Sequence, residues 1–96
     1  MESRRSQRER VAFSALLREA GGVRVDASMC DLSETGFRAD CAFPIAIGQR
    51  VFLTIPTFAP MEAIVAWRLG HEHGCKFLRP LHPAVFATIV SRHSGH

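Results

Sequence analysis

Apolar and polar residues alternate along most of this chain, and this period of two constrains its fold more than any other feature. One such run follows the Gly21-Gly22 pair, where apolar positions alternate with polar ones: Val23, Val25, Ala27 and Met29 against Arg24, Asp26 and Ser28. Successive side chains of a β-strand point to opposite faces, so the pattern is typical of strands that are buried on one face. Comparable runs occupy about residues 11–17, 23–29, 37–41, 51–55, 61–69 and 75–77.

Turn-forming residues separate these runs. They lie at Gly21-Gly22, Pro44–Gly48, Pro56–Pro60 and Gly70–Gly74. No segment between the runs is long enough for the helix that a parallel crossover needs, so the strands should pair antiparallel. Six short strands at this spacing predict an all-β fold, either a small barrel or a sandwich.

The period changes near the C-terminus. Apolar residues recur at helical spacing from Val85 to Val90, and Pro83 suits the first position of a helix. We predict a short α-helix at about residues 83–92 that packs Phe86 and Ile89 on the barrel.

The 96 residues suffice for one small domain. We expect a flexible arginine-rich arm at residues 1–10 and the barrel with its helix at residues 11–96. The net charge is +3, and four arginines of the arm lie within seven positions: Arg4, Arg5, Arg8 and Arg10. The arm has no apolar residue between Glu2 and Val11 that could pack on a core. A basic segment of this kind suggests an anionic partner, and a solvated terminus without a partner is the alternative.

Composition disfavours several other classes of protein. No run approaches the roughly 18 apolar residues of a membrane span. The N-terminal MESRRSQRER lacks the apolar run of a secretory signal, so we expect a cytoplasmic protein without membrane contact. The three cysteines are odd in number and include no C-x-x-C pair, so we expect free, buried or half-buried thiols at Cys30, Cys41 and Cys75.

The stretch CDLSETGFRAD interrupts the strand pattern at residues 30–40. Continued past Met29, the alternation places Asp31 on the apolar face, where an unpaired carboxylate is costly. In one interpretation, Asp31 and Ser33 cap a turn and Gly36 adopts a positive φ. In the other, the same groups face a ligand, and the glycine allows the ligand to approach closely. The stretch alone leaves both interpretations open.

The arm contributes a second pattern, R-x-x-x-R at Arg4 and Arg8, just before the first strand. At one edge of a barrel, these arginines and the turn at 31–36 would combine forked donors, a carboxylate acceptor and free backbone amides. A guanidinium pairs bidentately with phosphate or with guanine O6 and N7, and it also stacks on a base. A carboxylate accepts from guanine N1–H and its exocyclic amine. The combination points to a compact, anionic nucleotide that carries guanine.

In these two motifs the chain resembles the PilZ domain family, the bacterial receptor modules for cyclic di-GMP. The hallmarks of that family are RxxxR and a later [D/N]xSxxG, found here as RRSQR, which runs from Arg4 to Arg8, and as DLSETG. The 23 positions from Arg8 to Asp31 accommodate a strand, a turn and a second strand, as in the family. The stretches IGQRVFLTIP and AIVAWRLGHEHGCKFLRPL resemble its middle and last strands, so the resemblance covers essentially the whole chain.

The resemblance implies a six-stranded antiparallel β-barrel with a C-terminal helix and a site for cyclic di-GMP. Arg4 and Arg8 would bind guanine and phosphate groups, and Arg5 would assist with a phosphate. The turn would form the other wall of the site. The residues implied for ligand binding are Arg4, Arg5, Arg8, Asp31, Ser33 and Gly36.

Two neighbours of the motifs need separate interpretation. Arg10 is offset from the RxxxR motif and is a weaker candidate, which we expect to point outward from the first strand. Phe37 stands where many relatives carry a small residue, and its inward phase predicts a core position.

The implied mechanism is an arm that folds over the barrel edge and orders when cyclic di-GMP binds. The protein would then be an adaptor whose output passes to a downstream protein in motility, surface attachment (biofilm) or exopolysaccharide control, with no cofactor besides the ligand.

Other functions remain as alternatives. The strongest is a PilZ-like module that has lost nucleotide binding and acts through protein contacts alone. A metal site at HEHGC would use His71, His73 and Cys75, but a turn at Gly70–Gly74 would break their alternation, and paired zinc spacing is absent, so no metal is expected.

A nucleic-acid polymer and an enzymatic activity are also disfavoured. A basic face for RNA or single-stranded DNA would combine Arg24, Arg38, Arg50 and Arg68. Such faces usually carry aromatic stacking platforms, whereas Tyr is absent here and we expect Trp67 and most Phe residues on the inward phase. No Ser or Cys nucleophile stands in a recognisable motif with His and an orienting acid, so we expect no enzyme.

Overall fold

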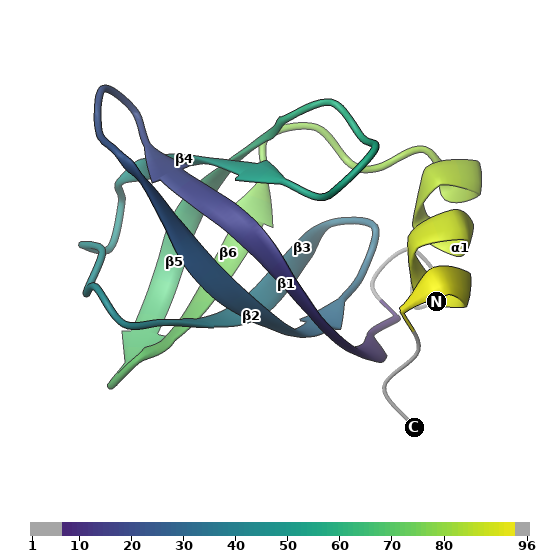
Figure 1. Cartoon of the computed structure of the whole chain (residues 1–96), viewed down its shortest axis with the longest axis horizontal. Coiled ribbons are helices and arrows are strands. Elements are labelled where there is room, and N and C mark those ends of the chain that lie inside the picture. The colour runs from purple at the N-terminus through teal and green to yellow at the C-terminus, as the bar shows by residue number, and fades with distance from the viewer. Residues whose placement is uncertain (1–6, 94–96) are drawn as a thin grey trace, which may run out of the picture.

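The computed structural model describes residues 7–93, which form a closed six-stranded antiparallel barrel and one C-terminal helix (Figure 1). The fold expected from the sequence is therefore confirmed. The strands follow one another around the barrel in the order β1-β2-β3-β6-β5-β4. The elements are β1 (Glu9–Glu19), β2 (Arg24–Leu32), β3 (Gly36–Cys41), β4 (Arg50–Thr54), β5 (Met61–Leu69), β6 (Glu72–Phe77) and α1 (Pro83–Arg92).

The connections between strands alternate between the two ends of the barrel (Figure 1). The β2–β3 turn, the β4–β5 loop and helix α1 lie at one end, which we call the helix end. The β1–β2 turn, the β3–β4 loop and the β5–β6 turn lie at the other, which we call the distal end. The motif DLSETG therefore belongs to the helix end.

The core fills the inside of the barrel with apolar side chains that alternate with outward ones. Phe37 is buried and packs on Phe77 with ring centroids 5.4 Å apart, so its predicted core position is confirmed. Ile89 of α1 is fully buried, and Phe86 is partly buried against the same core. The helix has the predicted bounds, and its N-cap, His82, accepts a hydrogen bond from the Ala84 N–H at 3.0 Å.

Bulges shift the alternation at three places, and two of them account for errors in the predicted faces of Trp67 and Asp31. Register shifts occur between Arg10 and Phe13, between Met29 and Asp31, and between Val65 and Trp67. The third turns Trp67 outward, where it is 37% exposed, so its predicted inward position is wrong. A bulge adds one residue to one strand and so reverses the face of the residues that follow it.

The β5–β6 turn is shorter than the sequence indicated. A turn over Gly70–Gly74 was predicted, but β6 begins at Glu72, so Gly74 lies within the strand. Gly74 has no room for a side chain, because a Cβ there would come within 2.0 Å of the Trp67 Nε1. The outward Trp67 side chain therefore lies directly over Gly74.

His73 of β6 is fully buried and is hydrogen-bonded to both the β3–β4 loop and the β5–β6 turn at the distal end. Its Nδ1–H donates to the His71 carbonyl oxygen at 2.8 Å, and its Nε2 accepts from the Ile45 N–H at 3.1 Å. These partners fix the neutral tautomer and occupy both ring nitrogens. Within residues 7–93, no three His, Cys, Asp or Glu side chains are grouped so that they could hold a metal ion. No helix in the same part of the chain has the length and apolar character that a membrane crossing requires.

All three cysteines are free thiols, as predicted. Burial raises the pKa of the Cys75 thiol from 9.0 to about 12, and the neighbouring Cys41 adds to the shift. The protonated thiol is therefore preferred more strongly in the folded than in the unfolded state. The contribution of the buried Cys75 thiol to the free energy of unfolding is fully present below about pH 9 and is lost as the pH rises towards 12.

We therefore expect the free energy of unfolding to fall faster above pH 9 in the wild-type protein than in Cys75→Ala. The difference between their slopes should be about 1.4 kcal/mol per pH unit. Urea unfolding of both proteins between pH 8 and pH 11 measures it. Parallel curves for the two proteins would contradict the assigned role of Cys75.

Candidate functional site

Asp31 lies on the outer face of the barrel, although the alternation predicted an inward position. The bulge between Met29 and Asp31 reverses the phase, so Leu32 takes the inward position opposite Phe37. Asp31 instead lies opposite Arg38. It is nevertheless only 8% exposed, because charged side chains cover it rather than the apolar core.

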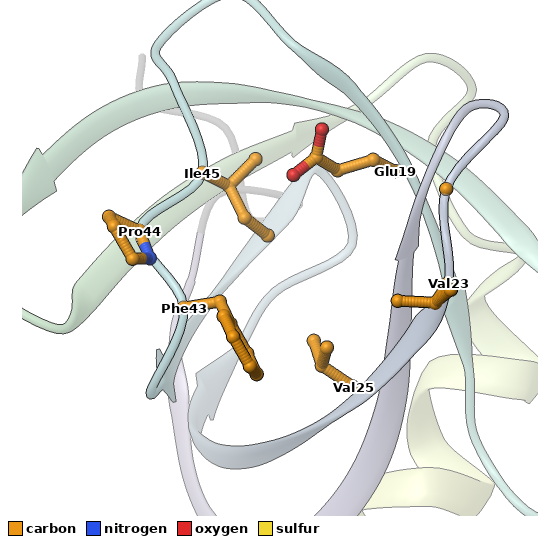
Figure 2. Close-up of a pocket in the computed structure, with 7 residues that line it drawn as sticks. Glu19, Val23, Val25, Phe43, Pro44 and Ile45 are labelled. Carbon is orange, nitrogen blue, oxygen red and sulfur yellow. The ribbon is translucent and has the colours of Figure 1, made fainter.

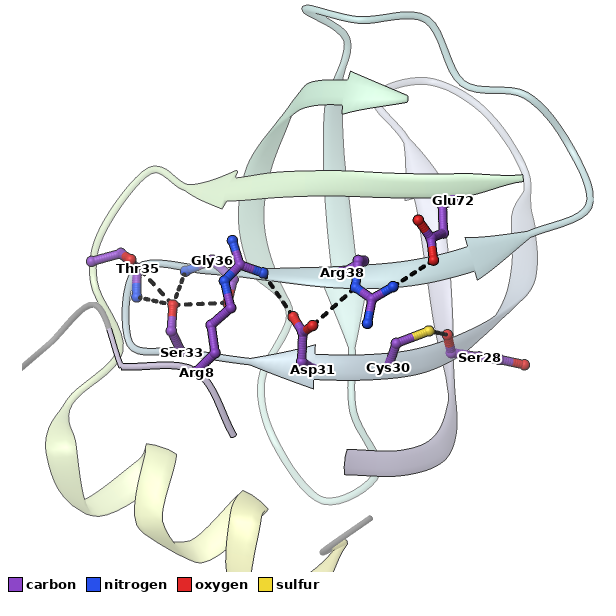
Figure 3. A network of polar contacts seen from close by, with 9 residues as sticks. All are labelled: Arg8, Ser28, Cys30, Asp31, Ser33, Thr35, Gly36, Arg38 and Glu72. Atoms are coloured by element: carbon purple, nitrogen blue, oxygen red, sulfur yellow. Dashed lines mark hydrogen bonds and ion pairs between the residues drawn. The ribbon is translucent and has the colours of Figure 1, made fainter. Parts of the chain in front are cut away.

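Two arginines bind the Asp31 carboxylate (Figure 3). Arg8 Nη1 donates to Oδ1 at 2.8 Å, and Arg38 Nε donates to Oδ2 at 2.9 Å. Arg38 also donates to Glu72 of β6 through Nη1. The four side chains form a row of alternating charge, Arg8–Asp31–Arg38–Glu72, which we call the charge row.

The two arginines of the charge row differ in accessibility. The Arg8 side chain is 57% exposed and that of Arg38 is 31% exposed. The hydrogen bond to Asp31 raises the pKa of Arg38 above its ordinary value, which keeps it charged. Arg8 uses one of its five N–H donors on Asp31 and therefore retains donors for another anion.

Ser33 caps the β2–β3 turn. Its Oγ accepts hydrogen bonds from the Thr35 N–H at 3.2 Å and from the Gly36 N–H at 3.1 Å. The Ser33 N–H in turn donates to the Gly36 carbonyl at 2.8 Å. The turn-capping interpretation is thus confirmed for Ser33, while Asp31 binds arginine side chains instead.

Gly36 does not have the positive φ that the turn-capping interpretation gave it. Within residues 7–93, the glycines with positive φ are Gly21, Gly48 and Gly70, so Gly36 does not supply that conformation. Instead, a Cβ at Gly36 would lie 2.3 Å from the Cys75 carbonyl oxygen of β6. Glycine is required here because β3 and β6 approach too closely for any side chain.

A shallow hollow of about 250 Å³ adjoins the turn. Arg8 and Ser33 line it together with Trp67 of β5 and Lys76 of β6. The hollow therefore combines two cations, two hydroxyl groups, of Ser33 and Thr35, and an indole. These groups suit an anionic ligand with a flat ring, because phosphate pairs with the cations and a ring stacks on the indole.

The sequence interpretation did not include Arg38, Trp67 or Lys76 in the cyclic di-GMP site, and it named Arg38 only for the disfavoured nucleic-acid face. Arg38 follows Phe37 on the outward phase and lies seven positions after Asp31, which is the one signal that could have indicated it. Trp67 and Lys76 reach the hollow only because β5 and β6 pair beside β3.

The predicted arm is described only in part. Arg4 and Arg5 lie outside the described residues, whereas Arg8 lies beside the turn and contacts Asp31, a direct contact that the motifs did not specify. Arg10 lies opposite Asp31 in the β1–β2 register and is exposed, in agreement with its expected outward position, but it does not line the hollow. The structure thus brings Arg8, Asp31, Ser33 and Gly36 together at the helix end.

Comparison with known proteins gives one finding about the whole domain. A family model described as the PilZ domain matches residues 2–91 of the 96 residues. The match spans both motifs, all six strands and most of α1. No curated protein sequence matches the chain significantly.

Proposed function

The chain belongs to the PilZ domain family, a family of receptors for cyclic di-GMP, and we propose that this protein binds cyclic di-GMP in the hollow beside its charge row. The hollow contains recognition groups for phosphate and for a base. The protein acts as a receptor and adaptor rather than as an enzyme. Its site in this proposal comprises Arg4, Arg5, Arg8, Asp31, Ser33 and Gly36, together with Trp67 and Lys76.

The observation that carries this proposal is the contact between Arg8 and Asp31. The two residues stand 23 positions apart and belong to separate motifs, yet their side chains meet at 2.8 Å beside the Ser33 turn. Asp31 orients the Arg8 guanidinium, while most of that side chain stays accessible. An oriented, exposed guanidinium is suited to paired hydrogen bonds with a phosphate or with guanine O6 and N7.

The rest of the ligand would contact the other walls of the hollow. Lys76 supplies a second positive charge for phosphate, and the exposed Trp67 offers a face on which guanine can stack. Gly36 lies at the edge of the hollow, where its close packing on β6 holds the Ser33 turn in place. Recognition thus combines charge, hydrogen bonding and stacking.

The hollow is small for a dinucleotide, which supports a role for the arm. Its volume of about 250 Å³ is below the roughly 300–1,000 Å³ of typical sites that enclose a ligand. Cyclic di-GMP would therefore extend beyond the hollow on the side from which Arg8 enters. In the proposed mechanism, residues 1–6 order over the ligand and Arg4 and Arg5 bind its phosphates.

The ordered complex is the output of the receptor. A downstream protein would recognise it in the cytoplasm, in the control of motility or biofilm formation.

A module that works through protein contacts without nucleotide is the second candidate, favoured by one observation. Both oxygens of Asp31 are bonded to arginines of the chain itself, so the charge row could serve the fold alone.

Calorimetric titration with cyclic di-GMP separates the two candidates, and we expect saturable binding that GTP and cyclic di-AMP do not reproduce. Trp67 is the only tryptophan, so its fluorescence should change over the same ligand concentrations. Absence of both heat and fluorescence change at high ligand concentration would reject the receptor and leave the protein-contact module.

A further inference from the structure

The distal end of the barrel carries an exposed apolar groove of about 320 Å³ (Figure 2). Val23 and Val25 of the first hairpin line one side of it, and Phe43 and Ile45 of the β3–β4 loop line the other. Val23 is 79% exposed and Phe43 is 63% exposed. Scattered exposed apolar residues are ordinary, but clusters of them mark interaction surfaces.

An acidic hollow of about 460 Å³ adjoins this groove. Its charged lining consists of Asp26, Asp40 and Glu72, from the neighbouring strands β2, β3 and β6. The groove and the hollow border on each other across the rim of the barrel, because Val25 and Phe43 line the groove while their chain neighbours Asp26 and Ala42 line the hollow. Successive residues of β2 point to opposite faces, so the groove opens at the end of the barrel and the hollow on its side. Together they form one surface with apolar and acidic halves, which we call the distal surface.

The charges of the acidic hollow are poorly compensated within the fold. Asp40 and Glu72 lie directly opposite each other in the β3–β6 register, an arrangement of like charges that destabilises a sheet. Glu72 has Arg38 as a partner, but no ion pair within residues 7–93 involves Asp26 or Asp40. Burial, and then the charge of Asp40, raise the pKa of the nearby Cys30 thiol, as expected in a negative field. The hollow therefore presents free negative charge to a partner.

We propose that the distal surface docks a basic, amphipathic segment of the downstream protein, with apolar side chains in the groove and Lys or Arg in the acidic hollow. The proposal rests on the receptor function, for which it supplies the output surface. An anionic membrane or a nucleic acid would be repelled by Asp26, Asp40 and Glu72. The basic arm of a second copy has charge but no apolar residue between Glu2 and Val11, so it lacks groups to fill the groove.

The charge row connects the ligand site to this surface. It runs from Arg8, at the proposed ligand, through Asp31 and Arg38 to Glu72, which lines the acidic hollow (Figure 3). A ligand phosphate on the remaining donors of Arg8 reduces the positive charge that Arg8 shares with Asp31, so Asp31 attracts Arg38 more strongly. Arg38 holds Glu72 through a different donor, and a shift of its guanidinium towards Asp31 weakens that bond and leaves more of the charge of Glu72 facing the hollow. Cyclic di-GMP should thus increase the affinity of the distal surface for a basic segment.

The test uses two synthetic amphipathic peptides, identical in their Leu and Phe face, one with Lys and the other with Glu on the polar face. We expect saturable shifts of backbone NMR signals at the distal surface with the Lys peptide and none with the Glu peptide. Asp40→Lys and Phe43→Ser should each weaken binding at least tenfold. Glu62→Lys, which changes the net charge equally but lies outside the surface, should keep binding within twofold. Shifts elsewhere, or an equal loss in Glu62→Lys, would overturn the proposal.

Two further measurements address the other occupants. Sedimentation of the protein alone tests whether a second copy of the chain occupies the distal surface. Flotation with phosphatidylglycerol vesicles tests whether a membrane does. We expect a monomer and no flotation. Self-association or flotation that Phe43→Ser removes would overturn the proposed occupant.

Repeating the Lys-peptide titration with saturating cyclic di-GMP tests the coupling, and we expect binding at least threefold tighter. Unchanged affinity would reject the coupling through Glu72. Peptide docking without any calorimetric ligand binding would reject the receptor function but support the distal surface. Ligand binding without peptide docking would reject the distal surface alone.

Discussion

Replacing Arg8 with alanine is expected to abolish cyclic di-GMP binding while the barrel stays folded. The Arg8 side chain is mostly exposed, and Asp31 keeps its bond to Arg38 when Arg8 is removed. The ligand would lose charge-assisted contacts worth about 1.5–3 kcal/mol each, and two such contacts correspond to at least a hundredfold loss of affinity. Calorimetric titration of the variant measures the loss, and circular dichroism verifies the fold.

Arg10→Ala is the matched control for this experiment. Arg10 is an exposed arginine two positions further along the same segment, and it does not line the hollow. Its removal changes the net charge equally, so we expect less than a threefold change in affinity. Nanomolar-to-micromolar binding that survives in an Arg4→Ala/Arg8→Ala double variant would refute the assigned site.

Gly36→Ala is expected to cost about 3 kcal/mol of unfolding free energy, an unusually large effect for one methyl group. The added Cβ would lie 2.3 Å from the Cys75 carbonyl oxygen, which belongs to the backbone of β6 and cannot rotate away. Strands β3 and β6 must separate locally, and the β2–β3 turn that carries Ser33 moves with them. Urea unfolding measures the loss, and ligand affinity should fall in parallel.

Gly48→Ala serves as the control for this substitution. Gly48 has a φ of +91°, but a Cβ there meets no atom within 4 Å. The substitution therefore strains the backbone without a collision and should cost about 1–2 kcal/mol. An equal or smaller loss for Gly36→Ala would show that β3 and β6 move apart easily and that their close approach does not require glycine.

The barrel could be predicted from the sequence because apolar residues alternate with polar ones in six segments. A wrong face assigned within one segment does not change the predicted fold. The helix was also predictable, since Pro83 and the period change mark it clearly. The faces on which Asp31 and Trp67 lie could not be predicted, because a bulge adds a residue to one strand without leaving a signature in that strand's own residues.

The candidate site was predictable only where a motif marks it. Arg8 and Asp31 were identified from RxxxR and DxSxxG as parts of one site, and the structure adds that their side chains are in direct contact. Arg38 and Lys76 carry no motif, and their places depend on pairing between strands that are distant in the sequence. The role of Gly36 likewise depends on the approach of β6, which no local pattern reports.

Closure of the barrel limits how this protein can communicate. Each of the six strands in the described part of the chain has two hydrogen-bonded neighbours, since β4 returns to β1. The pairing of β4 with β1 covers only Leu16–Glu19 and its pairing with β5 only Met61–Ile64, so closure protects these two strands in part. Where the pairing is complete, a partner cannot add a strand to the sheet, and a signal has to pass through side chains and loops. The specificity of such a contact can change in evolution without disturbing the backbone pairing.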